Sequence, residues 1–288
     1  MRGSTLLTMA LLAPICLGAS PAKAPPAKAI AAEKFVEWTP ANGPRVWTAG
    51  GVTATLGVRR NRDSTTPIVT VSAPGMTPLR IEAEENFGSA SVYVGIGSLK
   101  TGEKPSVIVQ SWTGGAHCCM HIVVVSPVGS GYRLIDMGSW DGDQVAWPRD
   151  VSGDGIADFV FRDQRFLYAF GSYAGSWPPP LIMNIRGLKP VDVSADPAFR
   201  PLFAAELAET RKECLEGDSL SGGACAGYLA NAARLGQFDP AWAKVAKTRA
   251  VTGGIYPASC SDTPRPKPCY SDFASAVRAF LRAGGYLR

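Results

Sequence analysis

The sequence predicts an α+β protein. An antiparallel all-β domain, arranged as a sandwich or a small propeller-like array, is followed by a small disulfide-stapled helical domain. Three observations support this fold class. Short apolar or alternating runs, separated by Gly, Pro, Asn and Asp, fill the chain from about residue 37 to residue 193. Apolar residues recur at intervals of three and four from about residue 197. The even number of cysteines beyond residue 29 favours disulfides in an exported chain.

Residues 1–29 are predicted to be a secretory signal peptide with its leader. Arg2 supplies the positive start, and Leu6 to Leu17 form an apolar run of the length that such signals need. This run is too short to span a membrane. Cleavage is expected at Ala27-Lys28-Ala29 or at Gly18-Ala19-Ser20. The protein is therefore expected to be exported, and to be periplasmic or secreted.

The charge of the chain limits the partners that it can have. Removal of residues 1–29 lowers the formal net charge from +5 to about +2, because three basic residues and no acidic ones are lost. So small a charge predicts no nucleic-acid partner. No later segment is apolar enough to be a membrane span. The partners expected outside the cytoplasm are a cell-wall glycan or an envelope protein.

The β-rich domain is predicted over residues 30–195. The runs that suit strands are Val52–Val58, Ile68–Val71, Leu79–Ile81, Ser91–Val94, Ser106–Gln110, Ile122–Val125, Tyr132–Met137, Asp158–Phe161, Phe166–Phe170 and Leu181–Ile185. No helical pattern separates these runs, so a parallel α/β sheet is not expected. The strands are therefore predicted to pair antiparallel.

The helical domain is predicted over residues 196–288. Phe199, Phe203 and Leu207 fall at helical intervals. Asp239-Pro240 is expected to open a helix, with the aspartate as N-cap and the proline at the first helical position. A last helix is expected to begin at Ser271-Asp-Phe-Ala274 and to end before the next glycine pair. These helices are short, so disulfides are expected to compensate for the small core.

The cysteines after residue 29 are predicted to form three disulfides. Six cysteines allow 15 pairings, and no spacing rule selects one of them. Proximity in the sequence favours Cys214–Cys225 and Cys260–Cys269, which leaves the adjacent residues Cys118 and Cys119 to each other.

The stretch Asp150-Val-Ser-Gly-Asp-Gly-Ile-Ala-Asp158 predicts a Ca²⁺ site. Oxygen atoms stand at positions 1, 3, 5, 7 and 9, and Gly155 at position 6 permits the sharp turn that brings them together. The predicted ligands are the side chains of Asp150, Ser152, Asp154 and Asp158 and the carbonyl oxygen of Ile156. The alternative is a plain turn in which the acidic side chains accept hydrogen bonds from backbone amides.

The sequence around this stretch resembles a known kind of calcium loop. Position 12 is Phe161 rather than the bidentate Glu of an EF-hand, and an apolar strand follows at once. From Asp150 to Phe161 the chain resembles the Asp-rich loops of FG-GAP and VCBS-type repeats, which implies a structural calcium ion. Those families repeat the unit, whereas this chain has a single copy, so a sandwich is favoured over a propeller.

Both histidines of the chain lie in one segment, His117-Cys-Cys-Met-His121. Strand alternation would place His117, Cys119 and His121 on one face, where they could form an alternative site for a transition metal, Cu or Zn. A vicinal disulfide between Cys118 and Cys119 competes with this site, because it removes both thiolates. The stretch that contains these cysteines, from Ser111 to Cys119, also resembles one found in exported bacterial proteins.

The sequence favours a non-catalytic protein. It lacks the motifs of a nucleophile elbow, a zinc protease helix or a phosphate-binding loop. Asp141 and Asp143, with Glu84 and Glu85, leave the carboxylate pair of a glycoside hydrolase open as an alternative. The overall prediction is an exported binding or envelope-associated module with a structural calcium loop. A transition-metal or redox role for the His-Cys-Cys-Met-His segment is the first alternative.

Two further alternatives concern cell-wall glycans. Four tryptophans near the cysteine and aspartate loops, with Tyr168 and Tyr173, could stack on sugar rings, unless they fill the core of the sandwich. They are Trp112, Trp140, Trp147 and Trp177. In addition, the segment from Glu213 to Leu235 is similar to the cysteine-stapled helical domains of periplasmic lysozyme-inhibitor-type proteins, which implies lysozyme inhibition.

Overall fold

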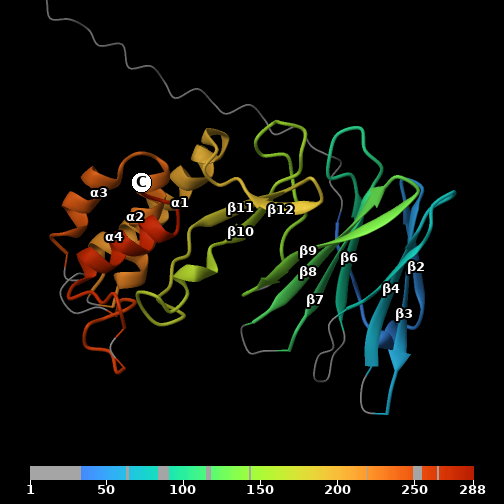
Figure 1. Ribbon diagram of the computed structural model, residues 1–288, viewed down its shortest axis with the longest axis horizontal. Helices are drawn as coiled ribbons and strands as arrows, with labels where there is room; N and C mark the ends of the chain where they lie inside the picture. The colour runs from blue at the N-terminus through green and yellow to red at the C-terminus, as the bar shows by residue number, and fades with distance from the viewer. Residues whose placement is uncertain are drawn as a thin grey trace, which may run out of the picture.

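The computed structural model describes residues 34–62, 65–83, 91–114, 118–142, 144–218, 220–248, 255–264 and 266–288. Over these residues the strands β1 to β12 form three antiparallel sheets, and the helices α1 to α4 follow them. The helices gather at one end of the molecule and the sheets lie side by side toward the other end (Figure 1). The predicted fold class is therefore confirmed.

Two of the sheets form a sandwich. The four-stranded sheet contains, in spatial order, β2 (Arg45–Ala49), β3 (Val52–Arg60), β4 (Thr65–Ser72) and β5 (Leu79–Glu82). The five-stranded sheet contains β1 (Val36–Trp38), β6 (Val92–Gly97), β7 (Ser106–Trp112), β8 (Met120–Val128) and β9 (Gly131–Trp140). Alternate residues of β3 are buried, and Leu56 packs in one core with Trp38 and Val109 of the facing sheet. The alternation of apolar and other residues in β3 thus reports a strand with one buried face.

The centre of the five-stranded sheet is buried on both faces. Its central strand β7 has no fully exposed residue, as expected for a continuous apolar run. Val109 faces the sandwich core, whereas Ile108 joins a second core with Phe159 and Phe161 of the third sheet. That three-stranded sheet contains β10 (Phe159–Arg162), β11 (Pro180–Arg186) and β12 (Lys189–Asp192).

The helices cover the remaining face of the three-stranded sheet. Ile182 of β11 packs in one core with Phe199, Phe203 and Leu235. The helices are α1 (Arg200–Glu216), α2 (Gly222–Arg234), α3 (Phe238–Val245) and α4 (Phe273–Ala283). The molecule is thus a row of four layers, three of sheet and one of helices (Figure 1). The change from strand to helix falls between Asp192 and Pro197, where the sequence pattern placed it.

The two local cysteine pairs of the helical region are disulfides. Cys214 of α1 and Cys225 of α2 are joined with their Cα atoms 4.6 Å apart, and the Cα atoms of Cys260 and Cys269 are 4.9 Å apart. Both separations lie within the usual range for disulfides. None of the helices among the described residues combines the length and the apolar character that a membrane crossing requires.

Two local predictions are wrong. The run Phe166–Phe170, predicted as a strand, is a 3₁₀ turn over Gln164–Phe166 followed by a loop. Both phenylalanines belong to the helical core, and Asp163 caps the turn by accepting a hydrogen bond from the backbone N–H of Arg165. Similarly, α3 begins at Phe238 rather than after Asp239, because proline is tolerated in the first turn of a helix and need not mark its first residue.

Candidate functional site

The loop that leads into β10 closes on its own backbone. Asp150 accepts hydrogen bonds from the N–H groups of Gly153 (2.7 Å) and Gly155 (2.9 Å), one on each carboxylate oxygen. The Oδ1 atom of Asp154 accepts a bond from the N–H of Ile156 (2.9 Å). Gly155 has a φ of +84°, a left-handed conformation that favours glycine, so it permits this turn as the spacing predicted.

Asp158 is the most deeply buried carboxylate of the loop, with 1% of its surface exposed. Its Oδ2 atom accepts hydrogen bonds from the N–H groups of Val151 (2.8 Å) and Ser152 (3.0 Å). Its Oδ1 atom accepts a short hydrogen bond from the side-chain amide of Asn184 on β11. Burial raises the pKa of Asp158 to about 6, and the negative charges of the other two loop aspartates add to the shift.

A second residue of β11 reaches the loop beside Asn184. The Nη2 atom of Arg186 lies 3.0 Å from Oδ2 of Asp154. The Nε atom of the same arginine donates to Oδ1 of Asn184 (3.0 Å). Residues 184 and 186 are two apart on one strand and therefore share a face, so β11 presents both side chains to the loop.

The residues predicted to bind calcium do not converge on one point. Asp150 and Asp158 turn toward the loop backbone, while Asp154 is engaged by Arg186. The hydroxyl of Ser152 donates to Asp150 (3.4 Å), and Ile156 forms an isolated β-bridge with Lys100. Across the described part of the chain, no three His, Cys, Asp or Glu side chains are placed to hold a metal ion. As placed, these residues do not fit a calcium ion, and the calcium site stays a prediction.

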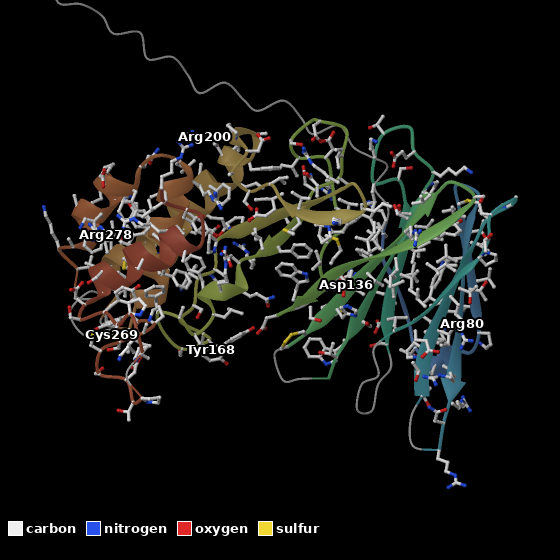
Figure 2. All side chains as sticks on the ribbon, in the orientation of Figure 1. Arg80, Asp136, Tyr168, Arg200, Cys269 and Arg278 are labelled. Atoms are coloured by element: carbon white, nitrogen blue, oxygen red, sulfur yellow. A yellow bond between two sulfur atoms is a disulfide. The ribbon has the colours of Figure 1, made fainter. Side chains whose placement is uncertain are left out.

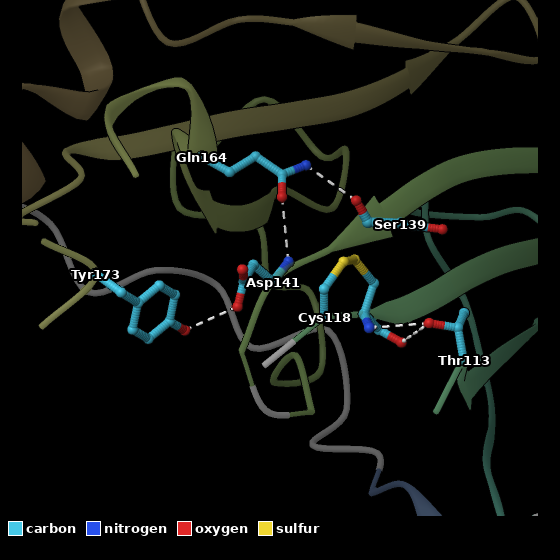
Figure 3. Close-up of a disulfide and its surroundings, with 7 residues drawn as sticks. Thr113, Cys118, Ser139, Asp141, Gln164 and Tyr173 are labelled. Atoms are coloured by element: carbon cyan, nitrogen blue, oxygen red, sulfur yellow. Dashed lines mark hydrogen bonds between the residues drawn. A yellow bond between two sulfur atoms is a disulfide. The ribbon is translucent and has the colours of Figure 1, made fainter. Parts of the chain in front are cut away.

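Cys118 and Cys119 are joined in a vicinal disulfide (Figure 3). Cys118 is exposed and Cys119 is buried. The backbone of Cys119 is fixed by Thr113, whose Oγ1 accepts its N–H (2.9 Å) and whose N–H donates to its carbonyl oxygen (2.9 Å). The disulfide is thus anchored at the ends of β7 and β8.

The structure separates the predicted transition-metal ligands. In the disulfide, Cys119 has no thiolate to offer a metal. The Nε2 atom of His121 lies 3.0 Å from Oδ1 of Asp136 on β9, and a hydrogen bond from the Gly138 N–H, with a smaller effect of His121, lowers the pKa of Asp136. His117 lies outside the described residues. A copper or zinc site therefore stays a prediction for the reduced protein.

The tryptophans of this region serve the core rather than a surface. Trp147 is 8% exposed, and Trp140 stacks on Phe161 with ring centroids 3.9 Å apart. Trp112 and Trp177 are partly buried against the same core and the helical core, respectively.

Among the described aromatic residues, Tyr168 is the exposed one, with 59% of its surface accessible; Figure 2 labels it. It lies beside Tyr173, whose Oη donates to Oδ1 of Asp141 (2.7 Å), near the vicinal disulfide (Figure 3). Asp143, Glu84 and Glu85 lie outside the described residues, so the predicted carboxylate pair stays a prediction.

Sequence reasoning missed a buried charge cluster after β10. Asp163, with 1% of its surface exposed, accepts hydrogen bonds on both oxygens from the guanidinium of Arg165 and another from the Tyr286 hydroxyl (2.8 Å). The carboxylate raises the pKa of Arg165, and burial raises the pKa of Tyr286. Tyr286 follows α4, so this cluster ties the end of the chain to the three-stranded sheet. No local pattern could reveal a contact between residues 123 positions apart.

The layers and the disulfides define this chain as a multilayered β protein with a disulfide-bonded helical C-terminal region. Residues 203–285 match the family model described as the sll0997 C-terminal domain. The chain is 30% identical over 254 residues to the probable thylakoid lumen protein sll0997 of Synechocystis sp., a match that covers 83% of this chain and 74% of that protein. The chain belongs to the sll0997 family.

A second relative is more distant. The chain is 27% identical over 258 residues to the uncharacterized protein y4bJ of Sinorhizobium fredii, which is 85% of this chain and 40% of that protein. No solved structure matches the chain. The C-terminal helices are thus assigned to the sll0997 family, while the resemblances to FG-GAP and VCBS loops and to lysozyme-inhibitor-type domains stay predictions.

Proposed function

We propose that this protein is a non-catalytic binding module of an exported compartment, and that the loop of residues 168–176 presents a tyrosine surface to a cell-wall glycan. A relative named a probable thylakoid lumen protein supports the compartment. The three disulfides support it as well, because disulfides persist in oxidising environments outside the cytoplasm.

The observation that carries the proposal is the conformation of Tyr168. Its ring is largely exposed, yet its φ of +58° lies in the left-handed region. That conformation costs a residue with a side chain about 1–2 kcal/mol. Strained residues of this kind persist only where the surroundings hold them, and they cluster at binding sites. An exposed aromatic ring fixed at such a cost is better explained by binding than by packing.

The loop that carries Tyr168 is held by its own serines. The N–H of Tyr168 donates to Oγ of Ser176 (3.0 Å), and the Ser176 hydroxyl donates to the carbonyl oxygen of Ser172 (2.9 Å). The loop also sits directly on α2. A Cβ atom added to Gly223 would lie 2.1 Å from the carbonyl oxygen of Gly175, so the approach of loop and helix requires glycine there. The tyrosine is therefore presented by a rigid loop, which lowers the entropic cost of binding.

The groups around Tyr168 suit a saccharide. Tyr173 lies with its ring centroid 5.5 Å from that of Tyr168 at an interplanar angle of 44°, so the two rings form a shallow corner rather than one flat platform. The carboxylate of Asp141, held by Tyr173, offers an acceptor to sugar hydroxyls. Aromatic faces stack on the C–H faces of sugar rings, and tyrosine adds a polar edge.

The experiment is a calorimetric titration of the mature, oxidised protein with soluble peptidoglycan fragments. Tyr168→Ala is expected to weaken binding about fivefold or more, which corresponds to the loss of roughly 1 kcal/mol of aromatic contact. Tyr168→Phe keeps the ring and is expected to stay close to wild type. Leu134→Ala, which truncates an exposed side chain on β9, is the matched control and should bind as wild type does.

Two results would reject the glycan assignment. One is a wild-type protein that gives no heat with the fragments. The other is a Tyr168→Ala variant that binds as tightly as the control. Retention on cell envelopes that survives complete digestion of the glycan would reassign the tyrosine surface to an envelope protein.

A further inference from the structure

We infer that the guanidinium of Arg186 supplies, from within the protein, the positive charge that a calcium ion supplies in loops of this spacing. The loop of residues 150–158 then closes without a metal.

The loop needs a compensating positive charge. It brings three carboxylates into nine residues, and both Asp150 and Asp158 are buried. Burial disfavours a charged carboxylate that has no compensating positive charge, and the carboxylates of this loop lie within nine residues of one another. Backbone N–H groups satisfy the hydrogen-bonding capacity of these oxygens, but they bring no net charge. A cation must therefore come either from solution or from another part of the chain.

Arg186 serves the same two carboxylates that an ion would join at positions 5 and 9. It pairs directly with Asp154, with Nη2 and Oδ2 3.0 Å apart. It reaches Asp158 through Asn184: the Nε atom of Arg186 donates to the amide oxygen, and the amide nitrogen donates to Asp158. Because the guanidinium polarises the amide, the amide N–H becomes a stronger donor to the buried carboxylate.

The arrangement excludes a simple addition of calcium. One oxygen of Asp154 caps the N–H of Ile156, and the other faces Arg186. Asn184 is completely buried on β11 and occupies the second oxygen of Asp158. An ion that used both aspartates would have to displace a resident guanidinium and a buried amide. Calcium should therefore stabilise the wild-type protein little, and should stabilise a protein without Arg186 much more.

Melting curves of wild-type protein, Arg186→Gln and Arg186→Lys, each in EDTA and in millimolar calcium, test this inference. The wild-type Tm is expected to be the same in both media. Arg186→Gln, which removes the charge but keeps polar atoms, is expected to melt about 3–6 °C lower in EDTA and to recover part of this loss in calcium. Arg186→Lys, which keeps the charge but offers one nitrogen in place of two, is expected to melt between wild type and Arg186→Gln in EDTA. Magnesium, which prefers a smaller and more rigid site, should not replace calcium.

Arg162→Gln is the matched control, because Arg162 lies on β10 of the same sheet and forms a partly exposed ion pair with Glu206 of α1. Its Tm should change little and should not respond to calcium. A wild-type Tm that rises with calcium would overturn the inference and restore the calcium site. An Arg186→Gln variant that melts like the control in both media would overturn it as well, since the arginine would then carry no essential charge.

Discussion

Two buried aspartates bracket the short strand β10 and are held in different ways. Asp158 precedes the strand and Asp163 follows it, and each has 1% of its surface exposed. Asp163 meets a guanidinium directly, through the Nε and Nη2 atoms of Arg165, and also accepts a hydrogen bond from the Tyr286 hydroxyl. The hydrogen bonds that Asp158 accepts from described residues come from backbone N–H groups and from the amide of Asn184. The guanidinium of Arg186 contacts that amide rather than Asp158 itself.

The difference shows that a buried carboxylate can be stabilised by direct pairing or by neutral donors backed by a distant charge. Direct pairing compensates the charge where it lies, so its loss exposes the full cost of burial. Where several neutral donors stabilise the carboxylate together, each donor contributes less to the free energy of unfolding. Burial raises the pKa of Asp158 to about 6. The two sides of β10 should therefore respond unequally when single partners are removed.

The largest effect is expected from Arg165→Met. The substitution leaves a carboxylate buried without its guanidinium, and the free energy of unfolding should fall by roughly 2–4 kcal/mol. The value lies below that of a fully buried pair because about half of the Arg165 side chain is exposed. Urea unfolding measures the change, with Arg162→Met as control for a surface ion pair. Equal losses for both variants would mean that Asp163 does not depend on direct pairing.

A smaller effect is expected from Tyr286→Phe. The phenyl ring keeps its contacts with Phe166 and with the guanidinium of Arg234, but Asp163 loses the hydroxyl donor. Loss of one hydrogen bond to a buried charged group should lower the free energy of unfolding by about 1–2 kcal/mol. In a double-mutant cycle with Arg165→Met the two losses should not add, because both partners serve one carboxylate. Strict additivity would contradict the cluster.

The smallest effect is expected from removing an exposed carboxylate that accepts a hydrogen bond from a backbone N–H group. Asp272 is exposed, and its Oδ1 atom caps α4 by accepting the N–H of Ser275 (2.7 Å). Asp272→Ala should lower the free energy of unfolding by about 1 kcal/mol. The Ser275 hydroxyl, followed by its N–H, lowers the pKa of Asp272.

The ionised cap therefore makes its full contribution to the free energy of unfolding at a pH above the pKa that Asp272 has in the unfolded chain. This contribution is lost as the pH falls through the lower pKa that Asp272 has in the folded protein. Urea unfolding of both proteins at neutral and at strongly acidic pH should show the difference between wild type and Asp272→Ala shrinking in acid. A difference that stays constant would show that the aspartate acts through something other than its charge.

The sequence predicted what local patterns encode. The run Ser106–Gln110 is a strand, and neighbouring cysteines at 214 and 225 and at 260 and 269 are paired, because both features depend on residues close along the chain. The turn at Gly155 follows from the conformation that glycine allows. Period alone could not separate a strand from a turn in the run Phe166–Phe170, where two phenylalanines enter the helical core from a loop.

The partners of the candidate loop were beyond sequence reasoning. Asn184 meets Asp158 across 26 residues and Arg186 meets Asp154 across 32, and both contacts exist only because β11 returns beside β10. The spacing of the loop oxygens predicts the ligands of an ion, but it contains no information about an arginine on another strand. The sequence likewise could not distinguish Tyr168 from the nearby tryptophans, because the exposure of its side chain is known only from the structure.

The layer beneath the helices constrains how this family can recombine its parts. The family model covers residues 203–285 and so begins inside α1, yet Phe203 and the preceding Phe199 pack on Ile182 of the three-stranded sheet. A protein that inherited these helices with a different N-terminal region would expose two phenylalanines unless that region offered an equivalent apolar strand. The core that the helices share with β11 therefore extends beyond the matched segment.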